Sequence, residues 1–466
     1  MTVFDELLET DGDNEWKAWL ELIFASRDEI VNFVAIRRGG HTTGPGEFTK
    51  YYKGSFNFCL RINFDDGDPD AIIRFPKPGH TATAWRDEKV TNEVNFINFL
   101  KDHTTIPVPR VTSWGLTAES PRGLGPFMIM EFIEGMKLSA FLKTPTESEQ
   151  DDEILNPEID DGVLDQIYGQ IANYMIQLSR LEFSAIGSIS RDEQRKTWDI
   201  TSRPLTYNMN ELATVSGYPI DKFPTEPFTS VRSYLEETAD SHILHFHTQR
   251  NLASTPEDAR RRYIARHRFK QLIPKYCLDD TGPFVPYCDD LQPSNILIDP
   301  ETLQITGLLD WEFTNAMPAQ FSSDPPWWLL LLGPDMWLED YSLNQFLTLY
   351  EPRLEQFLSA LEKAEKSDSK IKKEHAGWPP LSQRMRESWE SGRFWFDYGI
   401  RKSFDIDAVY WEVMNARFDE SAGVEMLDEK ARGEIDVVVA EKMGQLKVYR
   451  EECDARFNEK EAGTLR

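Results

Sequence analysis

The sequence has little cysteine and little positive charge, and both shortages narrow the settings in which the protein works. Its four cysteines, Cys59, Cys277, Cys288 and Cys453, show neither a CxxC pair nor the spacing of a disulfide framework, which fits a reducing compartment. Lysine and arginine number 51 against 79 acidic residues, so the formal net charge is -28. This charge would repel phosphates, which argues against nucleic acid and membrane surfaces as partners and is compatible with a cationic substrate.

Long apolar segments are also lacking. The densest apolar run, Trp327–Leu332, is too short to span a bilayer, and the acidic start of the chain lacks the features of a signal peptide. We therefore expect a cytoplasmic protein. With 466 residues, of which 40% are hydrophobic and 12% aromatic, the chain can build a large core in two or three domains.

Residues 1–135 carry the signals of a small sheet with one packed helix. Strand-favouring residues bounded by turns predict four strands, at residues 56–64, 71–75, 108–114 and 127–133. Between the second and third strands, residues 88–100 have apolar side chains at helical spacing. The rest of the chain is mainly helical in pattern, apart from a predicted hairpin at residues 296–309. We expect an α+β fold.

The most informative segment contains Asp290, followed five positions later by Asn295 at the start of an apolar strand. This spacing matches the D-x-x-x-x-N catalytic loop of kinases, in which a carboxylate accepts the hydrogen bond of the attacking hydroxyl group. The amide of the asparagine supplies an oxygen to Mg²⁺, a cation that prefers oxygen ligands. Asp310 ends the next predicted strand, where a kinase places its principal Mg²⁺ ligand. Each residue alone would more simply cap a turn or helix, but the three in this order favour a phosphotransferase.

The runs Asp-Leu-Gln-Pro-Ser-Asn-Ile-Leu-Ile-Asp (290–299) and Gly-Leu-Leu-Asp-Trp-Glu (307–312) are typical of one family. With them, the sequence resembles the aminoglycoside phosphotransferase and choline-kinase-like family. The resemblance implies a bilobal protein-kinase-like fold: a β-rich nucleotide-binding lobe (1–135), a larger helical catalytic lobe (136–350) and a helical extension packed on it (351–466). It also implies an ATP- and Mg²⁺-dependent kinase that phosphorylates a hydroxyl group of a small molecule.

The resemblance assigns roles to individual residues. Asp290 would be the catalytic base, and Asn295 and Asp310 would hold Mg²⁺. The residues expected to bind ATP are Gly54 and Ser55 in the turn over the phosphates, Arg74 and its partner Glu93, and the backbone of Glu131, Phe132 and Ile133 at the adenine. Arg74 replaces the family's phosphate-binding lysine. It keeps the charge and can bind a phosphate through two nitrogens, but the two side chains are not interchangeable.

Two further positions depart from the kinase pattern. Cys288 stands where the family usually has a loop-bracing histidine, and Asp289 stands where regulated protein kinases carry arginine. Arg74 and Cys288 favour an alternative, a catalytically inactive kinase-like binding protein (a pseudokinase). Retention of Asp290, Asn295 and Asp310 favours an active enzyme. A protein kinase is disfavoured because no segment resembling an activation loop follows Asp310.

Overall fold

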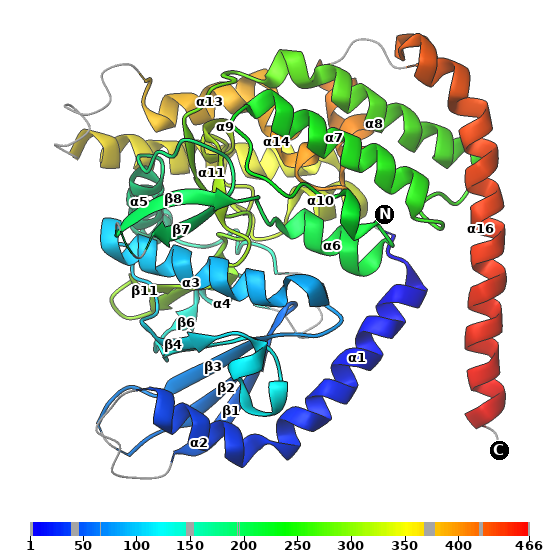
Figure 1. The fold of residues 1–466 in the computed structure, drawn as a ribbon. Coiled ribbons are helices and arrows are strands. Elements are labelled where there is room, and N and C mark those ends of the chain that lie inside the picture. The colour runs from blue at the N-terminus through cyan, green and yellow to red at the C-terminus, as the bar shows by residue number, and fades with distance from the viewer. Residues whose placement is uncertain are drawn as a thin grey trace.

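The computed structural model describes residues 3–38, 46–65, 67–145, 153–192, 194, 196–367, 378–418 and 423–464. These residues form two lobes, a smaller one built on a sheet and a larger one built mainly of helices (Figure 1). The two-lobed α+β architecture that the sequence predicts is confirmed.

The sheet of the small lobe is antiparallel and has the strand order β1-β2-β3-β5-β4. Its strands are β1 (Glu47–Lys53), β2 (Asn57–Asn63), β3 (Ala71–Pro76), β4 (Val111–Gly115) and β5 (Phe127–Glu131). The helices on its two faces are α3 (Arg86–His103) on one and α1 (Glu6–Ala25) with α2 (Arg27–Arg37) on the other. The predicted strands correspond to β2–β5. The pattern misses β1 because most of its side chains are polar and exposed.

Helix α1 runs from the large lobe to the small lobe (Figure 1). Just before its start, the amide of Asp5 donates to the carbonyl of Val215 in the large lobe at 2.8 Å. Farther along, the rings of Trp16 and Trp19 pack on Phe58 of β2, with centroid distances of 5.4 and 6.0 Å. The helix therefore ties the two lobes together.

At Gly12, helix α1 packs closely against the backbone of Gly79, and this contact leads to a testable prediction. A Cβ atom at Gly12 would lie 2.7 Å from the carbonyl oxygen of Gly79, which follows β3. The backbone of Gly79 would have to shift to make room for a methyl group, which costs more than rotating a flexible side chain. We therefore expect Gly12→Ala to lower the free energy of unfolding by about 1–3 kcal/mol. Urea denaturation measures this change.

The matched control is Gly169 in α5 (Asp161–Leu178), where a Cβ atom would meet nothing within 4 Å. Alanine is favoured over glycine in a helix interior, so Gly169→Ala should raise the free energy of unfolding by up to about 1 kcal/mol. A stabilising effect of both substitutions would contradict the close approach of Gly12 to Gly79.

The large lobe surrounds three small groups of strands. These are the sheet of β6 (Met136–Lys137), β10 (Ile296–Asp299) and β11 (Gln304–Leu308), the pair β9 (Phe284–Tyr287) and β12 (Asn315–Pro318), and the hairpin β7 (Ser188–Asp192) and β8 (Thr197–Ser202). The predicted hairpin at 296–309 corresponds to β10 and β11. The α-helices of the large lobe besides α5 are α4 (Leu138–Leu142), α6 (Tyr207–Val215), α7 (Val231–Thr248), α8 (Pro256–Tyr276), α9 (Ala319–Ser322), α10 (Pro334–Asp340), α11 (Leu343–Ser367), α13 (Leu381–Ser391), α14 (Arg393–Ile400), α15 (Ile406–Val409) and α16 (Glu429–Thr464).

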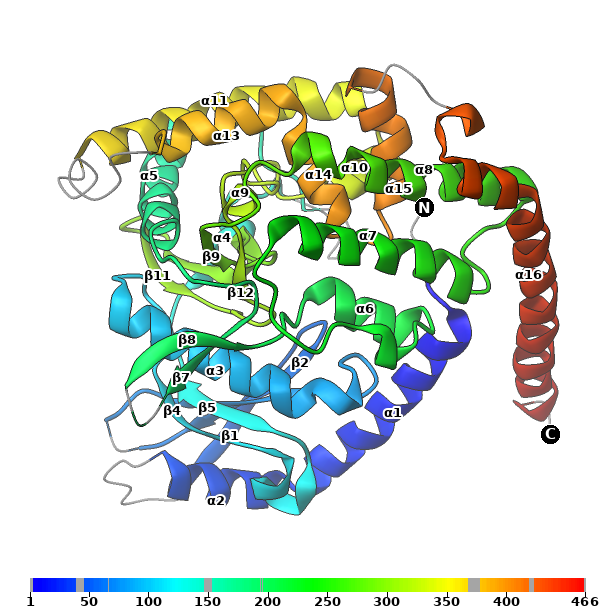
Figure 2. The same ribbon diagram turned by 45° about the horizontal axis from the view of Figure 1, so that its top comes forward.

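The C-terminal helices are part of the large lobe's packing. Helices α11 and α13 lie side by side along one edge, and α14 packs near α7 and α8 (Figure 2). Residue 351, the expected start of the helical extension, lies inside α11, which also packs on α5. In the described ranges, no helix combines the length and the apolar character needed to cross a membrane.

Candidate active site

Asp290 and Asn295 lie in one loop, residues 288–295, which joins β9 to β10. The Nδ2 of Asn295 donates to the Asp290 carboxylate at 2.8 Å and to the Asp290 carbonyl at 3.0 Å. Gln292 Nε2 also donates to this carboxylate. Burial, together with the charge of Asp310, raises the pKa of Asp290 to about 7. A carboxyl group with a pKa near neutrality is suited to take up a proton at physiological pH.

Asp310 follows β11 and adopts a left-handed backbone conformation with φ 62. Such a conformation is uncommon for a residue with a side chain and is often found at functional sites. The neighbouring Leu309 amide donates to the Asn295 carbonyl at 2.8 Å, so the two segments are bonded directly. Burial raises the pKa of Asp310, and the nearby guanidinium of Arg74 opposes this effect. Asp290, Asn295 and Asp310 are thus gathered in one place.

Arg74 on β3 and Glu93 on α3, which the sequence pairs, are in contact. Arg74 Nη1 donates to Glu93 Oε1 at 2.9 Å, and both side chains are buried. Arg74 Nη2 donates to Asp310 and, at 3.3 Å, to Glu312. Burial raises the pKa of Glu93 to about 7, against the opposing charge of Arg74. One guanidinium therefore joins the small lobe to the segment that contains Asp310.

A second buried cation, Lys89, was not found from the sequence. It lies one helical turn before Glu93, contacts the Glu312 carboxylate and donates to Asn57 Oδ1 at 2.9 Å. Asn57 Nδ2 in turn donates to Glu312 at 2.7 Å. Burial acts to raise the pKa of Glu312, but Lys89 and Arg74 outweigh it and hold the pKa below its usual value. The i, i+4 spacing of Lys89 and Glu93 was the available signal, because it places both on one helix face.

The turn between β1 and β2 contains Gly54 and Ser55, the residues expected over the phosphates. The carbonyl groups of both accept hydrogen bonds from Lys77 Nζ, at 3.2 and 3.0 Å. Lys77 itself lies over the Trp16 ring at 4.8 Å from its centroid. Burial and the charge of Lys53 lower the pKa of Lys77 to about 8. The turn is therefore held in place by a lysine braced against α1.

The backbone of residues 131–133, where adenine contacts are predicted, forms hydrogen bonds with neighbouring segments. The Glu131 amide donates to the Arg110 carbonyl at 3.1 Å, and the Phe132 amide donates to the Asp70 carbonyl at 2.7 Å. Both donors are therefore engaged within the protein. No acceptor for the Ile133 amide is found among the described residues.

Cys288 is the first residue of the loop, and its Sγ is 4.0 Å from the carbonyl oxygen of Asp310. Burial raises the pKa of its thiol, so the group stays uncharged and is a poor nucleophile. The weak contact between Cys288 and Asp310 is consistent with a bracing position. Asp289, the next residue, is bonded to Arg401.

The surroundings of Gly54 lead to a second prediction. A Cβ atom there would meet Asn57 at an ordinary 3.5 Å, so alanine fits the ligand-free turn. We expect Gly54→Ala to change the free energy of unfolding by less than about 0.5 kcal/mol. If the turn approaches phosphates closely, the methyl group weakens Mg-ATP binding about tenfold, or about 1.4 kcal/mol. Calorimetric titration measures the affinity, and unchanged affinity would show that phosphates do not approach Gly54.

Comparison with known proteins gives distant relatives. No family model matches the sequence. Clavilactone A biosynthesis cluster protein Y of Ampulloclitocybe clavipes is 24% identical over 287 residues, which cover 59% of this chain and 62% of that protein. A subtelomeric hrmA-associated cluster protein of Aspergillus fumigatus is 24% identical over 315 residues, 60% of each chain. The chain thus spans about three fifths of the length of these curated relatives.

Similar solved structures include a choline kinase of Cryptosporidium parvum, 12% identical, with a TM-score of 0.41 over 93% of this chain and 99% of that chain. An ethanolamine kinase of Plasmodium vivax is 12% identical, with a TM-score of 0.40 over 87% and 82%. An aminoglycoside phosphotransferase of Streptomyces rimosus is 14% identical, with a TM-score of 0.38 over 82% and 99%. These are proteins of the family that the sequence resembles.

Proposed function

We propose that the protein is an ATP- and Mg²⁺-dependent phosphotransferase that acts on a hydroxyl group of a small molecule. The observation that carries this proposal is the bonded cluster of Asp290, Asn295 and Asp310, joined through Arg74 to Glu93 of the small lobe. A carboxylate, an amide and a second carboxylate in this order are the groups that phosphoryl transfer requires. The buried cations Arg74 and Lys89 contact the carboxyl groups of Glu93, Asp310 and Glu312 beside this cluster.

The cluster fits Mg²⁺. Asn295 uses its Nδ2 in bonds to Asp290, so its Oδ1 is available as a ligand, and Asp310 adds a carboxylate. Mg²⁺ commonly takes one or two such protein ligands and completes its shell with water and phosphate oxygens. When bound, the ion would neutralise charge on the phosphates. The proposed site thus has two protein ligands, and a metal site of three or more histidine, cysteine or acidic side chains is not found among the described residues.

The protein's own groups would position the reactants. Asp290, held by Gln292 and Asn295, would accept the hydrogen bond and then the proton of the acceptor hydroxyl group. Arg74 would bind phosphate oxygens while its other nitrogen keeps the bond to Glu93. Most of the rate enhancement would come from orientation and charge compensation.

The acceptor would lie near Tyr207 at the start of α6. The Tyr207 ring packs against Phe56 of the turn between β1 and β2 and against Phe313, three residues after Asp310, at centroid distances of 5.4 and 6.3 Å. Burial raises the pKa of Glu211 to about 7 and that of Asp405 to about 8. The charge of Lys402 opposes this rise at both residues. An acceptor carrying positive charge is compatible with the net charge of -28.

The contact of Arg74 with Asp310 favours a second candidate function. If Arg74 stays hydrogen-bonded to the Asp310 carboxylate, this carboxylate does not hold Mg²⁺. The protein would then be a kinase-like binding protein that transfers no phosphate. This is the inactive alternative that Arg74 and Cys288 suggest in the sequence.

A phosphorylation screen distinguishes the two candidates. Wild-type protein is incubated with Mg-ATP and hydroxylated metabolites, including amino alcohols, aminoglycosides and neutral sugars, and phosphorylated products are identified by mass spectrometry. We expect product from at least one acceptor, none from Asp290→Asn, and a preference for cationic compounds. Binding of Mg-ATP without product from any acceptor would favour the inactive alternative.

A further inference from the structure

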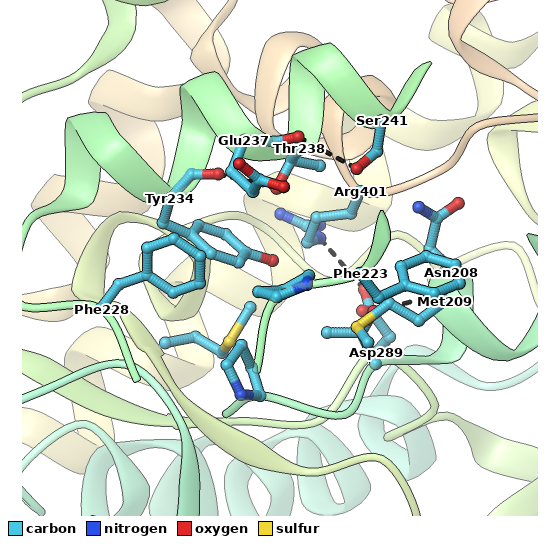
Figure 3. A pocket seen from close by; sticks show the side chains of 14 residues that line it. Asn208, Met209, Phe223, Phe228, Tyr234, Glu237, Thr238, Ser241, Asp289 and Arg401 are labelled. Atoms are coloured by element: carbon cyan, nitrogen blue, oxygen red, sulfur yellow. Dashed lines mark hydrogen bonds and ion pairs between the residues drawn. The ribbon is translucent and has the colours of Figure 1, made fainter. Parts of the chain in front are cut away.

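A buried arginine of the C-terminal helices reaches the residue that precedes Asp290. Arg401 follows α14, and its Nε donates to Asp289 Oδ1 at 3.0 Å (Figure 3). The Arg401 side chain is only 4% exposed. Its guanidinium lies over the rings of Tyr287 and Phe321, 4.7 and 4.6 Å from their centroids. Aromatic rings and a carboxylate thus fix the position of this cation.

The guanidinium is also held from its other side. Arg401 Nη1 donates to Asp324 at 3.4 Å, and Asp324 accepts a hydrogen bond from Ser388 of α13 at 2.6 Å. Asp289 has a second support, because Trp327 Nε1 donates to its carbonyl at 3.2 Å. The loop is therefore connected through one side chain to the turn after α9 and to the helices α13 and α14.

We propose that Arg401 is a positioning residue that acts through Asp289 to hold the 288–295 loop with Asp290 facing the acceptor. This inference rests on the proposed function. Asp289 and Asp290 are consecutive, and a chain has only two soft dihedral angles per residue. Fixing both the carboxylate and the carbonyl of Asp289 therefore leaves the Asp290 backbone few orientations. In this pair the loop supplies the carboxylate of Asp289, and the C-terminal helices supply the guanidinium of Arg401.

Loss of the Arg401 charge would release the loop. Asp289 is 23% exposed, so without its partner its carboxylate would turn toward water. Asp290 would keep its bonds to Gln292 and Asn295, which belong to the same loop and would move with it. The consequence would be a misplaced carboxylate in a folded protein.

Arg393, the first residue of α14, provides a matched control close to Arg401. Its side chain is 6% exposed, and it contacts Asp324 at 3.8 Å and Asp397 at 3.4 Å. It therefore belongs to the same buried charge network, yet no contact of Arg393 with the 288–295 loop is found in the described part of the chain. Arg393→Gln removes an equally buried charge without touching the loop.

The experiment compares Arg401→Gln, Arg393→Gln and wild type by three measurements. These are kcat and KM with an acceptor from the screen, Mg-ATP affinity by calorimetry, and hydrogen–deuterium exchange of the 288–295 loop. We expect Arg401→Gln to lower kcat roughly tenfold to a hundredfold, as for a misplaced catalytic group, with unchanged Mg-ATP affinity and faster exchange in the loop. Arg393→Gln should lose stability but keep the wild-type kcat and loop exchange.

Asp289→Ala should reproduce the kcat loss, and the double variant Asp289→Ala/Arg401→Gln should lose no more than the worse single variant, because both act through one contact. If Arg401→Gln does not fold, Asp289→Ala carries the test, because it removes the same contact from its 23% exposed partner. Equal kcat losses in the Arg401 and Arg393 variants, or wild-type loop exchange in the Arg401 variant, would overturn the inference. An inactive wild type would refute the proposed function instead, and loop exchange would still test the contact.

Discussion

Asp290→Asn should abolish phosphate transfer while Mg-ATP binding stays nearly intact. The substitution keeps the size of the side chain, and its oxygen can still accept one bond from Gln292 or Asn295. An amide cannot take the proton of the acceptor, and loss of a positioned general base lowers kcat roughly a hundredfold to ten-thousandfold. The nucleotide should be affected little, because Asn295 and Asp310 rather than Asp290 are assigned to the metal. Single-turnover assays measure transfer, and calorimetry measures binding.

The control is the same substitution at the other end of β10. The Asp299 carboxylate accepts a hydrogen bond from the backbone amide of Glu301 at 2.9 Å, away from the proposed active site. The side-chain oxygen of an asparagine can accept the same hydrogen bond. Asp299→Asn should therefore keep wild-type kcat. If Asp290→Asn retained most of the activity, Asp290 would not be the base.

Arg74→Met should have the largest effect on stability. The guanidinium of Arg74 contacts the buried Glu93 and Glu312 and the partly exposed Asp310. Its removal leaves these carboxylates with Lys89 as the one cation found in contact with them among the described residues. Breaking a buried ion pair by removing one partner costs about 3–5 kcal/mol, because the remaining charge is left uncompensated. We expect a loss of this size in urea denaturation, together with loss of Mg-ATP binding.

Arg110→Met is the matched substitution at an exposed pair. Arg110 is 58% exposed and contacts Glu131 on the surface, where an ion pair contributes at most about 1 kcal/mol. Arg74→Lys should fall between the two, since it restores the charge but not the three-way contact. Equal unfolding free energies for the Arg74 and Arg110 methionine variants would contradict the role of Arg74 as the shared cation.

The sequence was informative where local pattern decides the structure. The apolar side chains of β2 and β3 are typical of strands in the middle of a sheet. The spacing of Asp290 and Asn295 places an acid and an amide in one loop. Arg74 was recognisable because it interrupts an apolar strand. Edge strand β1 was missed because exposed polar residues carry no such pattern.

Contacts between distant segments could not be predicted. Asp289 and Arg401 are 112 residues apart, and Asn57 and Glu312 are 255 residues apart, so nothing in the neighbourhood of either partner indicates the other. The position of α1 between the lobes also depends on contacts between residues far apart in the sequence. It follows from tryptophan packing on β2 and from a bond to Val215, which are properties of the assembled fold.

The central claim is that Asn295 and Asp310 bind nucleotide together with Mg²⁺. Calorimetric titration of ATP into the wild-type protein and Asp310→Ala, each with Mg²⁺ and with EDTA, tests this claim most directly. We predict binding by the wild type only in the presence of Mg²⁺ and none by Asp310→Ala. At ~100 times the dissociation constant, Mg-ATP should also stabilise the wild type against unfolding by ~2.7 kcal/mol. Equal binding with and without Mg²⁺, or no binding at millimolar nucleotide, would contradict the claim.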